Sequence, residues 1–335
     1  MRPSKNHKKF WENRPVFITG VTGFVGGNLA ARLVREGAEV VGLIRDDVAA
    51  SNFRKLELAK KITGIYGDLE DYACIERIIN EYSIQYLYHL GAQAIVSTAN
   101  RSPLSTFNSN IRGTWNLLEA CRGKESLKSI IIASSDKAYG THKKLPYRED
   151  FALKPESPYD TSKACAELIA QAYYKTYGLP IVVTRFSNIY GPGDLNFSRI
   201  IPDTIQNLLQ DRAPIIRSDG TPKRDYLYID DAVDLYILLA EEIEKIRGEI
   251  FNAGHNAPIS VLKLVEKLIR ISGKNNLRPQ ILTKGRLHGE INHQWLDGRK
   301  VKRVLGWRPQ VKLDEGLVRS YQWYKRFLGS SEPKV

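Results

Sequence analysis

Short apolar runs of strand length alternate with longer segments of helical periodicity over the first half of the chain. The apolar runs read, in order, RPVFITG, AEVVGLI, ITGIYGDL, IQYLYHLGA, SIIIASS and LPIVVTRFSNIYG. Helices are expected between them over about 24–36, 106–122 and 158–177. Because the runs are largely continuous rather than alternating with polar residues, both faces of the strands should be covered. The pattern predicts a doubly wound α/β fold with a parallel sheet.

The pattern changes after Tyr190, where the sequence GPGD interrupts it. A helix is expected over about 199–210, RDYLYIDDAVDLYILLAEEIE is typical of a strand leading into a helix, and GEIFNAG is typical of a strand. The second half therefore predicts a smaller C-terminal α/β lobe built from several segments. We assign 11–186 to the first lobe with 225–254 returning to it, 187–224 and 255–330 to the smaller lobe, and 1–10 to a flexible basic N-terminus.

The composition narrows the class of protein. The chain of 335 residues is 42% hydrophobic, which is enough for one large domain or two fused ones. It has no apolar run of about 18 residues and no signal core near its start, so we expect neither a membrane span nor secretion. Cys74, Cys121 and Cys165 lack metal-ligand spacing, which predicts no metal site and favours a reducing cytoplasm. His89 lies in an apolar run and is expected to be a packed strand-end residue.

The net charge of +13 bears on the ligand. Lys and Arg are spread along the chain rather than clustered with aromatic residues, which argues against a nucleic-acid partner. The surplus of positive charge suits a small phosphate-bearing ligand, but a lysine-rich solvated surface explains it as well. Charge alone therefore leaves both interpretations open.

A glycine-rich turn follows the first predicted strand. In TGVTGFVGGNLA, Gly20, Gly23 and Gly26 are three residues apart and open a predicted helix. Glycine lets the backbone turn sharply and approach a pyrophosphate closely, and the start of the helix supplies free N–H groups. The alternative is an ordinary glycine turn, but the position between strand and helix favours dinucleotide binding.

The end of the second predicted strand bears on the choice between NAD and NADP. An acid that holds the ribose hydroxyls of NAD is usual there, but this chain has Ile44 followed by Arg45, which slightly favours the 2′-phosphate of NADP. Asp46 or Asp47 could still reach the ribose. Asp68 in GDL could accept a hydrogen bond from the adenine amino group or cap the next helix.

The segment SPYDTSKACAEL places Tyr159 and Lys163 four residues apart, on one face of a predicted helix. Beside a nicotinamide, the Lys163 ammonium would lower the pKa of the Tyr159 phenol. Tyr159 could then take the proton from a sugar hydroxyl while hydride leaves the same carbon. An exposed helix pair is the alternative, which the glycine turn and the upstream serines disfavour.

Nine segments together carry a family resemblance, namely TGVTGFVG, GDL, HLGAQ, NIRGTWNLLEA, SSDKAYG, YDTSK, RFSNIYGPGD, RDYLYIDD and LGWRP. Through them nearly the whole chain resembles the extended short-chain dehydrogenase/reductase family, of the NAD-dependent epimerase/dehydratase type. The resemblance implies a Rossmann lobe that binds NAD(P) and a smaller lobe that binds a nucleoside-diphosphate sugar. It also implies a homodimer formed through the helices that carry Asn110 and Tyr159.

The resemblance further implies which residues form the site. Ser135 would hold the sugar hydroxyl together with Tyr159. Substrate contacts are implied at Gln93, Asn188, Arg199 and Arg224, the last three near the nucleotide diphosphate. Cofactor contacts are implied at Gly20, Thr22, Gly23, Phe24, Val25, Gly26, Arg45, Asp68, Leu69, Leu90, Ala92, Tyr159 and Lys163.

Asp136 and Lys137 follow Ser135 directly, where the apolar run SIIIA ends. By resemblance, sugar 4-epimerases usually carry small or apolar residues here, whereas a 4,6-dehydratase needs two more proton-transfer groups. Asp136 is the candidate acid for the departing C6 hydroxyl, since a pocket of low dielectric keeps a carboxyl protonated. Lys137 is the candidate base for the C5 proton. The alternative is a surface ion pair worth at most about 1 kcal/mol.

The Ser-Asp-Lys triplet and GPGDLNFSRIIPD are similar to CDP-glucose 4,6-dehydratases, although Val25 replaces a lysine often found there. RDYLYIDD and GLIR are more similar to epimerases and GDP-mannose dehydratases. The favoured function is a nucleotide-sugar 4,6-dehydratase that makes a 4-keto-6-deoxyhexose. A C4 epimerase with the same Ser135, Tyr159 and Lys163 is the alternative, and a non-enzymatic binding protein is disfavoured by the intact Tyr-Lys pair. In either enzyme, NAD(P)⁺ would stay tightly bound and be regenerated in each cycle.

Overall fold

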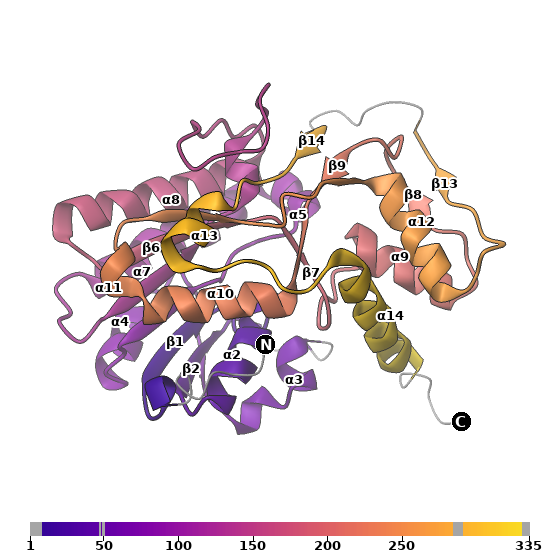
Figure 1. Ribbon diagram of the computed structural model, residues 1–335. Coiled ribbons are helices and arrows are strands. Elements are labelled where there is room, and N and C mark those ends of the chain that lie inside the picture. Colours follow the sequence, from indigo (N-terminus) through magenta and orange to yellow (C-terminus); the bar gives the residue numbers. More distant parts are fainter. Residues whose placement is uncertain (1–8, 47, 49–50, 284–290, 330–335) are drawn as a thin grey trace.

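The computed structural model describes residues 9–46, 48, 51–283 and 291–329, so residues 1–8 of the expected flexible N-terminus and Asp47 lie outside it. Its centre is a parallel sheet of seven strands in the order β11-β6-β5-β4-β1-β2-β3 (Figure 1). The strands are β1 (Pro15–Thr19), β2 (Glu39–Ile44), β3 (Thr63–Tyr66), β4 (Tyr86–His89), β5 (Ser129–Ala133), β6 (Ile181–Phe186) and β11 (Ile250–Ala253). The predicted doubly wound α/β fold is confirmed.

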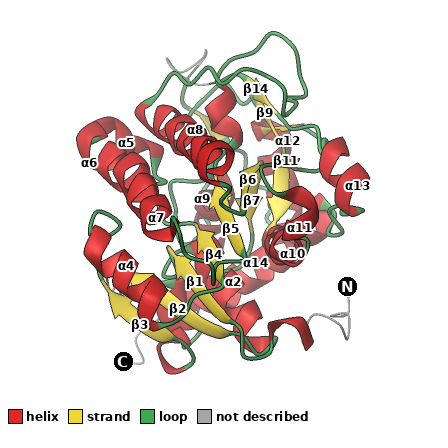
Figure 2. Cartoon of the chain, turned by 90° about the vertical axis from the view of Figure 1, so that its left-hand side faces the viewer, coloured by secondary structure: helices red, strands yellow, loops and turns green. Residues whose placement is uncertain are grey.

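Helices cover both faces of this sheet (Figure 2). On one side lie α4 (Tyr72–Glu81), α7 (Gly113–Cys121) and α8 (Pro158–Tyr177), and on the other lie α2 (Phe24–Arg35) and α10 (Ile229–Glu241). The strand residues divide between two apolar clusters, because Val16 and Ile18 pack on one face and Phe17 packs on the other. All three are fully buried, which explains why the strand sequences do not alternate between apolar and polar residues.

Helix α8 has the bounds that the sequence predicts. Its N-cap Ser157 accepts a hydrogen bond from the backbone N–H of Asp160 at 3.3 Å, and Pro158 occupies the first turn. Gly178 ends the helix in the left-handed conformation, with φ of 71°. Start and stop signals therefore both lie in the local sequence.

The helix expected over 106–122 is not a regular α-helix. It begins earlier, as α6 (Pro103–Phe107), passes through the π-helical turn η2 (Asn108–Arg112) and continues as α7. The π-helical turn accommodates Asn110, whose side chain is buried and forms hydrogen bonds with Gln93 and Ser162. Such turns often mark functional positions, and this one ties the loop after β4 to α8.

The run LPIVVTRFSNIYG forms two strands rather than the one expected. It leaves the sheet at Ser187, whose N–H still donates to the carbonyl of Ala253 at the end of β11. The next three residues form β7 (Asn188–Tyr190), which pairs in parallel with β10 (Tyr226–Tyr228) instead. The change of partner carries the chain from the sheet into the second lobe.

The second lobe lies beside the sheet, to the right in Figure 1. Its helix α9 (Ile200–Leu209) agrees with the expectation within one residue at each end. The other elements there are β8 (Ile215–Ile216), β9 (Lys223–Arg224), β12 (Ile259–Ser260), α12 (Val261–Ser272), β13 (Gln280–Ile281), β14 (His293–Gln294) and α14 (Leu313–Gly329). The remaining short helices of the described residues are α3 (Asn52–Lys55), η1 (Leu58–Lys60), α5 (Val96–Arg101), α11 (Ile243–Ile246) and α13 (Arg299–Leu305).

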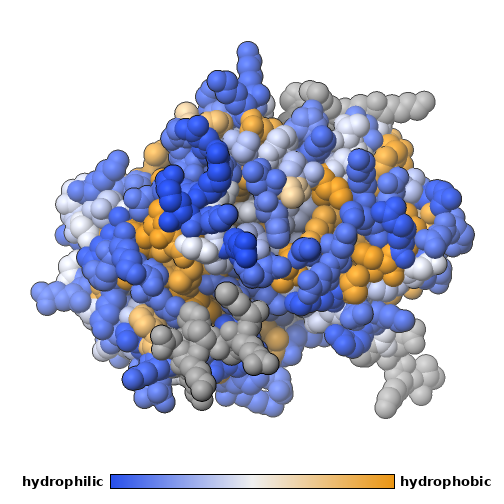
Figure 3. All heavy atoms as spheres, viewed as in Figure 1, coloured by the Kyte–Doolittle hydropathy of each residue, from blue (hydrophilic) through white to orange (hydrophobic). Residues whose placement is uncertain are grey.

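The surface is rich in charged side chains, with apolar atoms showing between them on the face in Figure 3. In the part of the chain that is described, no helix has the length and apolar character needed to cross a membrane. Phe10, which was expected to belong to the flexible N-terminus, is packed: its ring contacts Trp11 and Tyr86, with centroids 5.0 and 5.7 Å apart.

His89 at the end of β4 is packed, as the sequence predicts. It is 4% exposed and forms hydrogen bonds with the hydroxyls of Thr19, at 2.8 Å, and Thr114, at 3.0 Å. Burial, with a smaller contribution from the charge of Lys163, lowers the pKa of His89 to about 3. The folded protein therefore keeps this imidazole neutral at pH values where the unfolded chain binds a proton.

His89→Gln should remove part of the acid lability of the fold. Because the folded pKa of about 3 lies below the unfolded value of about 6.5, the stability due to neutral His89 is lost as the pH falls through this window. The stability difference between wild type and variant should shrink by about 2 kcal/mol between pH 6.5 and 5, at about 1.4 kcal/mol per unit. Urea unfolding at both pH values measures it, and a constant difference would contradict the prediction.

Candidate active site

Ser135, Asp136 and Lys137 follow the end of β5, at the edge of the sheet where the parallel strands end. The chain turns there into the short 3-10 helix η3 (Asp136–Tyr139), with Ser135 as its N-cap. The Ser135 hydroxyl accepts a hydrogen bond from the N–H of Lys137 and donates one to Asp136 Oδ1, both at 3.2 Å. The local sequence therefore fixes the orientation of the serine and of the acid next to it.

Asp136 is buried, which rules out the surface ion pair considered from the sequence. Its side chain is 3% exposed, and its Oδ2 has no hydrogen-bond partner among the described residues. Burial raises the pKa of this carboxyl, against the opposing effect of Lys137, Ser135 and Arg224. The arrangement favours a protonated carboxyl that can donate a proton.

Lys137 is half-buried, and its ammonium donates to Gln294 Oε1 at 3.4 Å. The same charge acts on a second carboxyl, that of Asp160, which is 7% exposed. Burial raises the pKa of Asp160, and Lys137 is the first of the groups that oppose this shift. Gln294 and Asp160 were not identified from the sequence, although Asp160 stands beside Tyr159 in the segment YDTSK.

Tyr159 and Lys163 lie in the first turns of α8, and both are buried. The predicted lowering of the Tyr159 pKa by Lys163 is wrong for this structure. Burial raises the pKa of Tyr159 to about 12, while a hydrogen bond with Ser135 and the charge of Arg199 oppose it. The Lys163 ammonium donates to the carbonyl of Ala133 at 2.7 Å instead, and burial lowers its pKa to about 8.

The glycine turn after β1 fits a dinucleotide. Gly20 has φ of 73°, and a Cβ there would lie 2.7 Å from the N of Gly91. A Cβ at Gly26 would collide with the carbonyl oxygen of Gly20. Gly23 precedes α2 without a side-chain cap, so the first N–H groups of this 12-residue helix have no side-chain acceptor. Close approach and an uncapped helix start are the features that a pyrophosphate requires.

The other expected cofactor residues lie around this turn and along the same edge of the sheet. Thr22, Phe24, Val25, Leu90 and Ala92 are half-buried, and Leu69 is buried. They belong to the start of α2 and to the chain just after β3 and β4.

Arg45 and Asp68, the residues expected near the ribose and the adenine of the cofactor, each contact a neighbouring residue in the structure. Arg45 forms an exposed ion pair with Asp46 at 2.7 Å. Asp68 accepts a hydrogen bond from the N–H of Glu70 at 2.9 Å. The suggestion that Asp68 caps the next helix is wrong, because Asp71 caps α4 through the N–H of Cys74.

The four expected substrate residues are held by hydrogen bonds and ion pairs. Asn110 fixes the backbone of Gln93, with its Oδ1 accepting from the Gln93 N–H at 2.7 Å. Asn188 donates to the carbonyl of Asp225 at 3.3 Å. Arg199 pairs with Asp194 at 3.1 Å and is close enough to lower the pKa of Tyr159.

Arg224 is 9% exposed and donates to three backbone carbonyls, those of Ile291, Lys223 and Asn292. Its charge opposes the raised pKa of Asp136. Arg199 and Arg224 of the second lobe thus lie close to the residues that follow β5 and to those in the first turn of α8.

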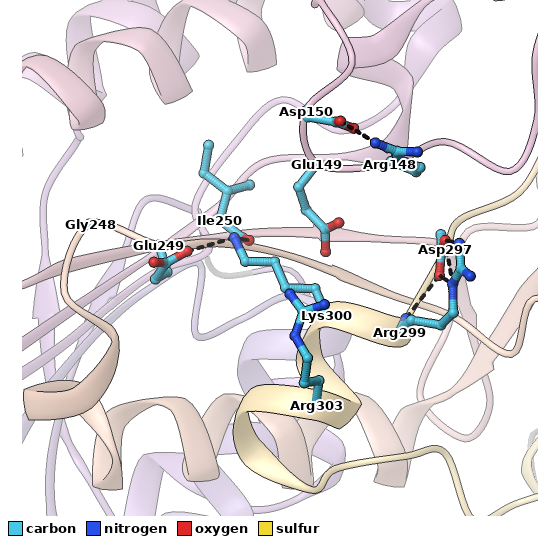
Figure 4. Close-up of a pocket in the computed structure, with 10 residues that line it drawn as sticks. All are labelled: Arg148, Glu149, Asp150, Gly248, Glu249, Ile250, Asp297, Arg299, Lys300 and Arg303. Atoms are coloured by element: carbon cyan, nitrogen blue, oxygen red, sulfur yellow. Dashed lines mark hydrogen bonds and ion pairs between the residues drawn. The ribbon is translucent and has the colours of Figure 1, made fainter.

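A hollow of about 600 Å³ lies elsewhere, against the edge strand β11 (Figure 4). None of the expected site residues lines it. Six of its eight charged side chains form ion pairs, between Arg148 and Asp150, Arg299 and Asp297, and Lys300 and Glu249. Its lining residues are Arg148, Glu149, Asp150, Gly248, Glu249, Ile250, Asp297, Arg299, Lys300 and Arg303. This hollow is a solvated group of ion pairs, separate from the Ser135 site.

A family model described as GDP-mannose 4,6 dehydratase matches residues 17–320. The chain belongs to the NAD-dependent epimerase/dehydratase family of short-chain dehydrogenases/reductases. Relatives in this family fall into two groups. The chain is 33% identical to UDP-glucuronate 4-epimerase of Thermodesulfobacterium geofontis, covering 92% of this chain and 95% of the relative. It is 29% identical to CDP-glucose 4,6-dehydratase of Salmonella typhimurium, covering 96% and 93%.

Solved structures of the family share the fold. The crystal structure of UDP-glucuronic acid 4-epimerase from Bacillus cereus, in complex with UDP-glucuronic acid and NAD, matches with a TM-score of 0.84 and 29% identity. The match covers 93% of this chain and 99% of that one. At about 30% identity the relatives divide between 4-epimerases and 4,6-dehydratases, so the reaction has to be argued from the side chains.

Gly26→Ala should weaken the binding of the dinucleotide while leaving the rest of the fold intact. The added methyl group collides with the Gly20 carbonyl and pushes the turn away from the helix, at a cost of about 1–3 kcal/mol in stability. We expect the affinity for NAD or NADP, measured by calorimetric titration, to fall at least about tenfold. Gly329→Ala, where a Cβ meets nothing within 4 Å, is the control. Unchanged affinity in the Gly26 variant would show that the dinucleotide binds elsewhere.

Proposed function

We propose that this protein is a nucleotide-sugar 4,6-dehydratase, which converts an NDP-hexose to an NDP-4-keto-6-deoxyhexose. The observation that carries the proposal is the buried carboxyl of Asp136, adjacent in the chain to Lys137 and hydrogen-bonded to Ser135. Both groups of relatives act on a nucleotide-linked sugar, so the coarser conclusion of a nucleotide-sugar-modifying enzyme does not depend on this choice.

The chemistry assigns a task to each side chain. Ser135 and Tyr159 hold the C4 hydroxyl, and Tyr159 takes its proton. Bound NAD(P)⁺ would supply the hydride chemistry, accepting hydride from C4 and returning it to C6. A keto group at C4 makes the C5 proton acidic, and Lys137 removes it and returns it to C5 when C6 receives the hydride. Asp136 protonates the departing C6 hydroxyl, which leaves as water.

A C4 epimerase is the alternative, and the UDP-glucuronate 4-epimerase named above is slightly more similar to this chain than the CDP-glucose 4,6-dehydratase. Such an enzyme needs Ser135, Tyr159 and Lys163 but no further acid, because it only removes and returns hydride at one carbon. Burying a carboxyl without a full set of partners costs stability, so a site that did not use Asp136 would gain by losing it. This cost supports dehydration over epimerisation.

The cofactor and the division of labour between lobes form part of the proposal. Residues 11–186, with 225–254, hold NAD(P), and residues 187–224 and 255–330 hold the nucleotide of the sugar through Arg199 and Arg224. Arg45 and Asp46 stand together after β2, the former suited to a 2′-phosphate and the latter to ribose hydroxyls. We favour NADP slightly because the guanidinium follows the strand directly, and analysis of the cofactor that co-purifies decides between the two.

A homodimer through α6, α7 and α8 is the proposed assembly. These helices lie side by side (Figure 2), and each carries an exposed apolar side chain. Leu104 is 71% exposed, Trp115 46% and Leu168 61%. Covering such side chains stabilises an interface by about 25 cal/mol for each Å² of apolar surface. The cytoplasmic location stays a prediction.

Asp136→Asn should stop the loss of water but leave C4 oxidation, because the amide keeps the size of the carboxyl and cannot donate a proton. Reduced nicotinamide should therefore accumulate on the enzyme, and the rate of dehydration should fall about 10²–10⁴-fold. Absorbance of reduced nicotinamide and the mass of the product measure the two effects. Tyr159→Phe is the contrast, since it should abolish the first oxidation as well.

Normal turnover in Asp136→Asn would remove Asp136 from the mechanism. A panel of CDP-, UDP-, dTDP- and GDP-linked hexoses tests the reaction class in wild type. A product lighter by one water supports dehydration, whereas a product of unchanged mass with altered chromatographic mobility supports the epimerase.

Leu168→Glu should shift the protein towards monomers, because a charge in the middle of the proposed interface has to be desolvated on association. Sedimentation at several concentrations measures the change. Leu282→Glu, at a leucine that is 64% exposed in the second lobe, is the matched control and should leave the assembly unaltered. An unchanged oligomeric state in the Leu168 variant would place the interface on another surface.

A further inference from the structure

Gln294 lies at the site and has no role in the function described so far. It belongs to β14, and its side chain is 0% exposed. Its Oε1 accepts the hydrogen bond from Lys137 Nζ, while its Nε2 has no partner among the described residues. An amide nitrogen can donate two hydrogen bonds, and leaving a buried donor unpaired destabilises the folded protein. The unpaired donor therefore points to a group that arrives with the ligand.

The backbone around Gln294 is fixed on two sides. In the parallel pairing of β14 with β9, Gln294 lies opposite Arg224. The following residues pair with Tyr147, whose N–H donates to the carbonyl of Trp295 and whose carbonyl accepts from the N–H of Asp297, both at 2.9 Å. The backbone that carries Gln294 is thus held in place before any ligand binds, as a positioning group requires.

Lys137 needs such a partner because its side chain is long and flexible. Ordering a lysine side chain costs conformational entropy, among the largest such costs of any side chain. Among the described residues, only Gln294 accepts a hydrogen bond from Lys137 Nζ. The carboxyls of Asp136 and Asp160 attract the same ammonium electrostatically, but neither forms an ion pair with it in the described structure. Gln294 therefore selects one orientation of Lys137 among those that the two acids would allow.

We propose that Gln294 is a positioning residue with two contacts. Its Oε1 holds Lys137 in the orientation for proton transfer, and its Nε2 donates a hydrogen bond to an uncharged oxygen, hydroxyl or keto, of the bound hexose. The proposal rests on the function proposed above, in which Lys137 removes the C5 proton. It adds a residue of the second lobe to the group that handles the sugar.

A double-mutant cycle tests the proposal. Gln294→Met keeps the size of the side chain and removes both polar atoms. In the wild-type background, we expect kcat to fall roughly 10- to 100-fold and KM for the nucleotide sugar to rise several-fold. In the Lys137→Met background, the same substitution should leave the residual kcat unchanged and still raise KM, because only the contact with the sugar remains to be lost.

Two further variants keep the outcome interpretable. Gln294→Asn retains the amide but withdraws it from Lys137 by one methylene, so it should reproduce the loss of kcat if the methionine variant does not fold. Gln280→Met, at an exposed glutamine of β13, is the matched control and should change neither constant. An equal loss of kcat with and without the Lys137 side chain would overturn the positioning role, and an unchanged KM would overturn the contact with the sugar.

The failure of this proposal is distinguishable from the failure of the proposed function. The mass of the wild-type product alone decides whether the enzyme dehydrates. The cycle is measured on whatever product the wild type forms, so coupling between Gln294 and Lys137 is tested in either case.

Discussion

All seven strands of the central sheet run in the same direction, and both faces of the sheet are buried under helices. Polar groups therefore have one place to gather around it, the edge where the strands end. The turn at Gly20 follows β1, the loop to Gln93 follows β4, and Ser135 and its neighbours follow β5. The common direction of the strands, imposed by the crossover connections between them, is what brings the glycine turn and the polar residues after β4 and β5 to the same edge.

Burial at this edge has an electrostatic consequence that the residues share. It raises the pKa of Asp136 and of Tyr159, the latter to about 12, and lowers that of Lys163 to about 8. Each shift favours the uncharged form, because a charge is poorly solvated there. Lys137 and Ser135 oppose the shift of Asp136 and Ser135 opposes that of Tyr159, and two further opposing groups, Arg224 and Arg199, come from the second lobe. The charge state of the site therefore depends on how the two lobes and the charged phosphates meet.

The sequence predicts well what local signals determine. The bounds of α8 follow from Ser157, Pro158 and Gly178, and the glycine turn needs no distant partner. It predicts poorly what depends on contacts between distant segments. The break at Ser187 results from a change of strand partner, and Gln294 reaches Lys137 from 157 residues away. The direction of the Tyr159 pKa shift could not be predicted for the same reason, because the burial that raises it depends on the assembled site.

Dehydratases and epimerases of this family share the fold, so similarity of about 30% to both groups is what a common scaffold predicts. The difference between the reactions is a pair of proton transfers at C5 and C6, which requires two groups beyond those that oxidise C4. In the proposed mechanism η3 supplies both groups, and β14 of the second lobe contacts one of them through Gln294. An epimerase has no need to fix a lysine at that point. The contact between η3 and β14, more than the sheet or the glycine turn, is therefore the feature on which the proposal of dehydration over epimerisation depends.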